Sequence, residues 1–212
     1  MEVVLPLLET KQPTAVIASL EHETREGNGL EDASLEVAFD SLREESRAHL
    51  PFLGLFVSRV HCGVLADFVH RNAPGREVYT RLIDSPPDAS GWERVLDEAT
   101  RHGLVRRIDD GRYALHPTLP VFLRRRLRSG IKDEGVEALN TEFTRFYAVF
   151  AGHYYEGVKR ADPGEMAAVE TEEANLLRAL SLSLGGVDWG VADVLMATLE
   201  GNYSAGPVRT GM

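Results

Sequence analysis

One histidine stands where an imidazole could bind an anion. His116 ends a strand-like run that begins at Arg112, and a predicted helix follows it directly. An imidazole in this position can donate a hydrogen bond to an anion. The alternative is an ordinary surface histidine, and the spacing alone favours that alternative.

The dense basic cluster follows the same run. Arg124, Arg125, Arg126 and Arg128 fall on the predicted helix over residues 121–128. Guanidinium groups match the geometry of phosphate oxygens, so Arg124 and Arg125 are candidate contacts to a phosphate of a nucleotide or a nucleic acid. The alternative is a solvated helix face whose arginines pair with Asp or Glu.

The sequence offers little support for catalytic or metal-binding chemistry. The sequence has neither a Gly-x-x-x-x-Gly-Lys-Ser/Thr phosphate loop nor a Gly-x-Gly-x-x-Gly motif, which excludes independent hydrolysis of a nucleoside triphosphate. The seven histidines are scattered without metal-ligand spacing. Cys62 beside His61 is better explained as a small buried thiol than as a nucleophile dyad. We therefore expect no enzyme activity, no catalytic residue and no metal site in this chain.

A short hairpin must position His116. Residues 104–108 and 112–116 are strand-like, and Asp110-Gly111 between them is typical of a tight turn. A type I′ turn here would require positive φ at both residues. The preceding helix, 90–101, begins with Ser90 and Glu93 in the spacing of a capping box. Three earlier apolar segments are predicted as helices: 35–42, the dense run 50–60, and 63–71. Helices followed by a hairpin predict a winged helix.

The C-terminal part is predicted to be helical throughout. Aromatic residues recur at threes and fours over 136–158, and we expect this stripe to be the core of the C-terminal half. Asp162-Pro163 separates that helix from a second one over 164–184, and a last helix begins near Trp189. We expect the tail from Gly201 to be frayed. A further short helix is predicted over 13–23.

Composition narrows the class of protein. The 212 residues carry a formal net charge of −10, which argues against nonspecific binding to nucleic acid or an anionic membrane. Glu93, Asp97 and Glu98 on the predicted recognition helix would also face DNA phosphates. A single cysteine and the absence of a long apolar run predict a cytoplasmic protein without a membrane span.

Taken together, these motifs resemble a family. The chain is similar to STAND-type signal-transduction ATPases with an NB-ARC core, over the region from the winged-helix domain to the start of a tetratricopeptide-like array. The stretch from Ser34 to Phe68 resembles the start of that winged helix, and Leu104 to Pro117 resembles its hairpin. The segment from Glu170 to Leu180 resembles the entry into the array.

The resemblance implies a mainly α fold in three parts. Residues 1–30 would end an upstream helical domain, 31–130 would form the winged helix, and 131–212 would begin antiparallel helical hairpins. It further implies a bacterial switch protein with ADP or ATP bound by a nucleotide-binding domain outside this chain. In the family, a histidine at the end of the wing strand reaches the diphosphate of ADP, and His116 occupies that position.

Three functions follow as hypotheses. The first is a regulatory module that couples the nucleotide state of that upstream domain to a downstream helical sensor array. The second is a winged-helix regulator of transcription that binds DNA, and the third is a helical protein–protein scaffold. Whether the chain forms a homo-oligomer stays open.

Overall fold

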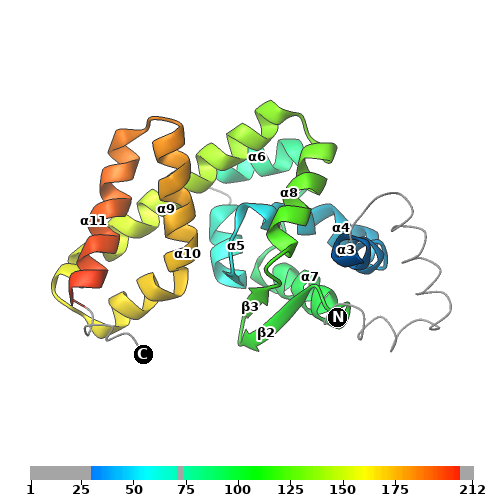
Figure 1. Cartoon of the computed structure of the whole chain (residues 1–212), viewed down its shortest axis with the longest axis horizontal. Helices are drawn as coiled ribbons and strands as arrows, with labels where there is room; N and C mark the ends of the chain where they lie inside the picture. Colours follow the sequence, from blue (N-terminus) through cyan, green and yellow to red (C-terminus); the bar gives the residue numbers. More distant parts are fainter. Residues whose placement is uncertain (1–29, 71–73, 206–212) are drawn as a thin grey trace. The chain divides into compact units, whose positions relative to one another are not determined.

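The computed structural model describes residues 30–70 and 74–205, and these are mainly helical with one small antiparallel sheet (Figure 1). The chain divides into two compact units, one reaching to Val136 and the other starting at Glu137. The expected helix at 13–23 lies outside the described residues. Within the described ranges, no helix is both long enough and apolar enough to cross a membrane.

The first unit consists of short helices around a buried core. Its helical elements are α3 (Leu30–Asp40), α4 (Glu44–His49), the 3-10 helix η1 (Leu50–Leu55), α5 (Cys62–Phe68), α6 (Pro74–Leu82), α7 (Ala89–Arg101) and α8 (Leu119–Gly130). Helix α6 was not predicted, because its nine residues carry few apolar side chains.

The sheet has three strands in the order β1-β3-β2, all antiparallel. They are β1 (Arg59–His61), β2 (Val105–Asp109) and β3 (Arg112–Leu115). The prediction of one core helix over 50–60 was therefore wrong: the run is buried, but it forms η1 and then β1. Ser58 has a positive φ of 69° and redirects the chain from one element to the other.

The hairpin between β2 and β3 is confirmed, with a different turn from type I′. Gly111 has a φ of +72°, whereas Asp110 does not adopt a positive φ. A type I′ turn requires positive φ at both central residues. A register shift between Arg107 and Asp109 accompanies the turn. The hairpin thus needs a glycine at one position only, and a local irregularity in β2 closes it.

Helix α7 begins two residues earlier than a capping box at Ser90 would place it. Asp88 is the N-cap, and its Oδ1 accepts a hydrogen bond of 2.7 Å from the amide of Gly91. The Ser90 hydroxyl donates to the same carboxylate. Asp88 is a better N-cap than Ser90 would be, because its charged acceptor at the helix N-terminus also interacts with the helix dipole.

Aromatic side chains form the core of the first unit. Phe52 of η1 lies 4.8 Å from Tyr79 of α6, 5.2 Å from Phe68 of α5 and 5.9 Å from Trp92 of α7, measured between ring centroids. All four rings are almost fully buried. This cluster joins four helical elements, and two of them contact the rest of the unit: η1 packs against α8 and α7 against β2.

The second unit contains three long helices: α9 (Asp133–Lys159), α10 (Pro163–Gly185) and α11 (Trp189–Ala205). Asp162 caps α10 by accepting from the amides of Gly164 and Glu165, which confirms the predicted break. Helices α10 and α11 lie side by side and run in opposite directions (Figure 1), and Tyr203, near the end of α11, donates to Glu173 in the middle of α10. The tail predicted to fray from Gly201 is helical as far as Ala205.

The aromatic stripe of α9 is buried only in part. Phe143 and Tyr147 are fully buried, whereas Phe146, Phe150 and Tyr154 keep intermediate exposure. The side chain of Tyr147 reaches α10, where its hydroxyl bonds to Glu172. Thr198 of α11 donates to the carbonyl of Ala151 in α9. The centre of the unit is thus a mixture of aromatic packing and buried polar contacts.

Candidate functional site

His116 lies between the central strand of the sheet and helix α8. β3 is hydrogen-bonded on both sides, and the amide of Leu115 also donates to the carbonyl of Ser58 at 2.8 Å. The backbone of His116 is therefore fixed. Its Nδ1 lies 2.8 Å from the Thr118 hydroxyl oxygen, and the side chain is half-buried. This contact orients the ring and leaves Nε2 as the nitrogen that can meet a ligand.

The four clustered arginines divide into two kinds. Arg125 pairs with Asp32 of α3 at 2.7 Å. Arg126 pairs with Glu36 of the same helix, and its guanidinium lies over the rings of Phe39 and Phe122. These two side chains have anionic partners within the chain and fasten α8 to α3. Arg125 is therefore a weaker candidate for a phosphate contact than its place in the sequence suggests.

Arg124 differs from its neighbours. Its Nε donates to the carbonyl of Pro120 at 3.1 Å, so the guanidinium lies back over the first turn of α8. It has no carboxylate partner among the described residues. Burial lowers the pKa of Arg124, and the nearby charge of Arg128 lowers it further. Among the described side chains no acid compensates these two like charges, which raises their affinity for an anion.

A glycine allows this arrangement. A Cβ on Gly54 of η1 would lie 2.6 Å from the backbone nitrogen of Arg124 and 3.0 Å from its Cγ. Glycine therefore lets η1 pack directly on α8 and on the stem of Arg124. His116 and the Arg124 guanidinium both lie at the N-terminal end of α8, where they offer donors to an oxyanion but no nucleophile or general base.

Cys62 and His61 do not form a reactive pair. Burial, with the charges of Glu93 and Asp97, raises the pKa of the Cys62 thiol to about 12. His61 instead caps α5, because its Nδ1 accepts from the amide of Gly63 at 3.0 Å. Sequence reasoning missed this cap, since histidine is an uncommon residue at a helix N-terminus.

The acidic residues of α7 have intramolecular partners. Arg107 of β2 pairs with Glu93 at 2.9 Å and with Asp97 at 3.4 Å, and the Tyr113 hydroxyl donates to Asp97 at 2.6 Å. These contacts fasten the hairpin to α7. Glu98 on the opposite side accepts from Ser46 and from Arg43, and so fastens α7 to α4.

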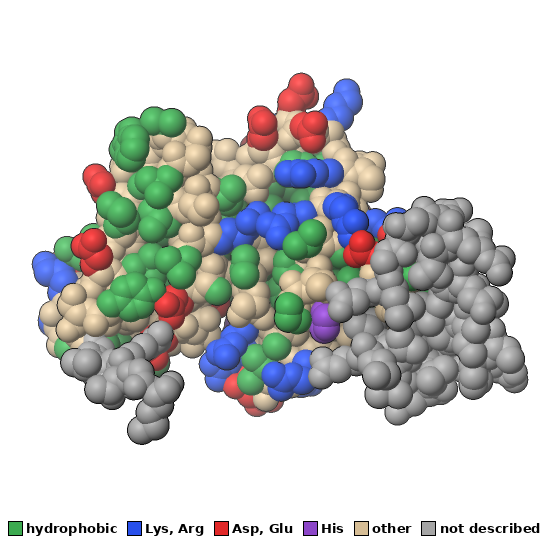
Figure 2. Space-filling model, in the orientation of Figure 1, with side chains coloured by type: hydrophobic (Ala, Val, Ile, Leu, Met, Phe, Trp, Pro, Cys, Tyr) green, Lys and Arg blue, Asp and Glu red, His purple; other side chains and the backbone are tan. Residues whose placement is uncertain are grey.

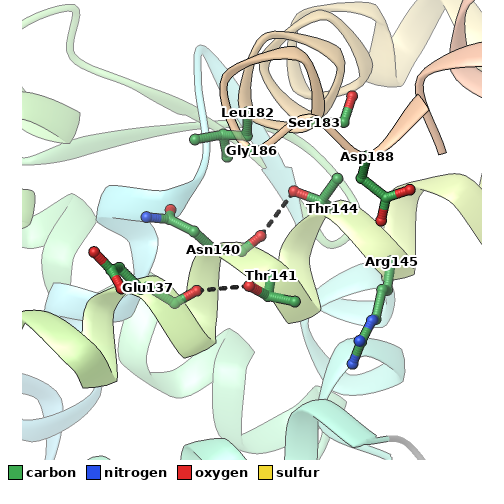
Figure 3. A pocket seen from close by; sticks show the side chains of 9 residues that line it. All are labelled: Glu137, Asn140, Thr141, Thr144, Arg145, Leu182, Ser183, Gly186 and Asp188. Carbon is green, nitrogen blue, oxygen red and sulfur yellow. Dashed lines mark hydrogen bonds between the residues drawn. The ribbon is translucent and has the colours of Figure 1, made fainter. Parts of the chain in front are cut away.

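A cavity of about 420 Å³ lies in the second unit, between α9 and the turn that joins α10 to α11 (Figure 3). Thr141 and Thr144 line it, but their hydroxyls donate to carbonyls of their own helix. Arg145 pairs with Glu142. The cavity offers no concentrated charge, and its residues appear in the sequence as an ordinary polar helix face.

Metal chemistry has no support in the part of the chain that the structure describes. No group of three or more His, Cys, Asp and Glu side chains is placed there to hold an ion.

Comparison with known proteins found no matching family model, no matching curated protein and no matching solved structure.

Proposed function

We propose that this chain is a regulatory module of a STAND-type switch, coupling the nucleotide state of a separate nucleotide-binding domain to a helical sensor array. The module would be non-catalytic. ADP bound by the partner domain would be contacted through its phosphates by His116 and Arg124. Loss of that contact would release the module into a second packing, as in other two-state switches.

The single observation that carries the proposal is the contrast within the arginine cluster. Arg125 and Arg126 are neutralised by α3, but Arg124 is half-buried without a carboxylate partner in the described chain. It points toward the end of α8 at which His116 lies. A chain with a net charge of −10 has many acids available to pair an arginine. An external anion explains why this position has none.

The order of elements supports a winged helix as the scaffold. The elements follow one another in the order α4 with η1, β1, α5, α7 and the hairpin β2–β3. Helix α6 is inserted before α7. β3 lies between the other two strands, as expected when a hairpin adds to a first strand. In the second unit, the antiparallel α10–α11 pair supports a tetratricopeptide-like array.

The α7 contacts favour this proposal over DNA binding. A recognition helix needs basic side chains toward the phosphates. In this chain α7 presents Glu93 and Asp97, and these bind Arg107, one of the arginines of the hairpin. Duplex DNA binding that weakens with salt at low micromolar protein would restore the transcriptional alternative.

The test is ADP release from the complete switch, meaning the chain together with its nucleotide-binding domain. We expect His116→Ala and Arg124→Ala each to accelerate release of a fluorescent ADP analogue by about tenfold, equivalent to about 1.4 kcal/mol. His153→Ala is the matched control, because His153 is an exposed histidine of α9. Release rates that stay at the wild-type value in both variants would exclude the proposed contact.

A further inference from the structure

The α10–α11 pair has an exposed apolar face that neither the proposed nucleotide contact nor the helical core uses. Figure 2 shows hydrophobic side chains gathered over these two helices. Leu177 and Leu184 of α10 are 45% and 42% exposed, and Trp189, Met196 and Tyr203 of α11 are 61%, 38% and 49% exposed. Single exposed apolar residues are ordinary on a protein surface, but five in ordered positions require an explanation.

The spacing of these residues is regular. Trp189, Met196 and Tyr203 are each seven residues apart, as are Leu177 and Leu184. Seven residues are almost two helical turns, so each set forms a stripe along its helix. The two stripes border the same face, because the hydroxyl of Tyr203 reaches Glu173 at 2.6 Å, one turn before Leu177. A stripe with this period matches the side-chain repeat of another helix.

The charged side chains of α11 beside its stripe are acidic. Asp193 and Glu200 of α11 are exposed, and α11 contains no lysine or arginine. Glu173 lies at the end of the α10 stripe, where it accepts the Tyr203 hydroxyl. A second copy of the same face would bring these carboxylates together, which disfavours self-association through it.

We propose that the α10–α11 face, called here the heptad face, docks an amphipathic helix with basic flanks. The apolar stripe of that helix would cover Leu177, Leu184 and Met196. Its lysines or arginines would lie beside Asp193 and Glu200. The proposal is independent of the nucleotide contact at His116, because it concerns different residues in the other unit.

The experiment uses two synthetic peptides on the wild-type chain. Both are helical, about 17 residues long to match the roughly 25 Å of α11, with the same apolar heptads. One has lysine at its flanking positions and the other glutamate. Emission of Trp189 reports binding, because Trp189 is exposed whereas Trp92 is fully buried. We expect the lysine peptide to bind about tenfold or more tightly than the glutamate peptide, with a difference that shrinks in high salt.

Two variants locate the binding. Met196→Glu should weaken the lysine peptide by about tenfold or more. Val149→Glu is the matched control, since Val149 is a 75% exposed residue of α9 outside the heptad face, and it should leave affinity unchanged. Circular dichroism checks that both variants remain folded.

Several results would overturn the proposal. Neither peptide binding, or both binding equally at low salt, would do so without reference to any variant. Equal weakening by Val149→Glu would place the contact elsewhere. A wild-type dimer in sedimentation that Met196→Glu dissociates would show that a second copy of the chain occupies the face instead.

Discussion

The hydroxyl of Tyr147 donates a 2.6 Å hydrogen bond to Oε2 of Glu172, and both side chains are buried. The amide of Asn175 donates to the same oxygen at 2.8 Å. Burial and the adjacent Glu172 charge raise the pKa of Tyr147 well above its ordinary value, so the phenol remains a donor. Glu172 and Asn175 belong to the motif that resembles an array entry. With Tyr147 they form a buried hydrogen-bond network that joins α9 to α10.

Removing the phenol should destabilise the second unit. Tyr147→Phe leaves Glu172 with one fewer donor in a buried site, and we expect a loss of about 1–3 kcal/mol in the free energy of unfolding. Urea denaturation measures this loss. Tyr155→Phe is the control, because Tyr155 is less buried and its hydroxyl makes no hydrogen bond to an acid among the described residues. Equal stability of Tyr147→Phe and wild type would show that the hydrogen bond contributes nothing.

Truncating different aromatic side chains of the α9 stripe should lower the free energy of unfolding by different amounts. Phe143→Ala removes a fully buried ring and should cost about 3–5 kcal/mol. Phe146→Ala, at a partly exposed position, should cost clearly less. Thermal unfolding of both variants checks the order. A larger loss for Phe146 than for Phe143 would contradict the burial pattern along this helix.

The sequence predicted the helices of the second unit well because their apolar pattern repeats over several helical turns and Asp162-Pro163 marks a sharp boundary. It could not rank the aromatic residues of the stripe, since a period shows which side chains share a face but not how deeply each is covered. β1 was missed for a different reason. Its three residues follow a dense apolar run, and a strand this short is defined by its pairing with β3 rather than by its own pattern.

The candidate site was predictable by residue type but not by pairing. His116 and the arginine cluster are visible in the sequence. That Arg125 binds Asp32, 93 residues earlier, depends on how α3 packs against α8. The distinction between Arg124 and its neighbours, which supports the proposed function, therefore comes from tertiary structure alone.

Glu98 should make the stability of the first unit depend on pH. Burial, the largest single influence, raises the pKa of Glu98, but hydrogen bonds from Ser46 and Arg43 together outweigh it and leave the pKa below 4.5. A carboxyl with a lowered folded pKa stabilises the fold fully above its unfolded pKa and loses this contribution as the pH falls through the folded value.

Glu98→Gln tests this dependence. At pH 7 the variant should be less stable than wild type by about 1.5–3 kcal/mol, since hydrogen bonds to a charged group are replaced. The difference should narrow as the pH falls below the ordinary value of 4.5. Chemical denaturation at several pH values provides the measurement. A difference that stays constant down to acidic pH would contradict the assigned role.

Gly111 should be intolerant of a side chain. Its φ is +72°, and an added Cβ would lie 3.2 Å from Nε2 of His61. Gly111→Val should therefore cost about 1–3 kcal/mol. Gly130→Ala is the control, because a Cβ there meets no atom within 4 Å. An unchanged melting temperature for Gly111→Val would mean that the hairpin turn adapts without strain.

The central claim is that the N-terminal end of α8 contacts the phosphates of ADP in the assembled switch. Hydrogen–deuterium exchange over residues 116–124 tests it most directly, on the chain together with its nucleotide-binding domain. The account predicts slower exchange of this segment with ADP than with a non-hydrolysable ATP analogue, while the α10–α11 turn serves as an internal reference. Equal exchange of the segment in both nucleotide states would contradict the claim.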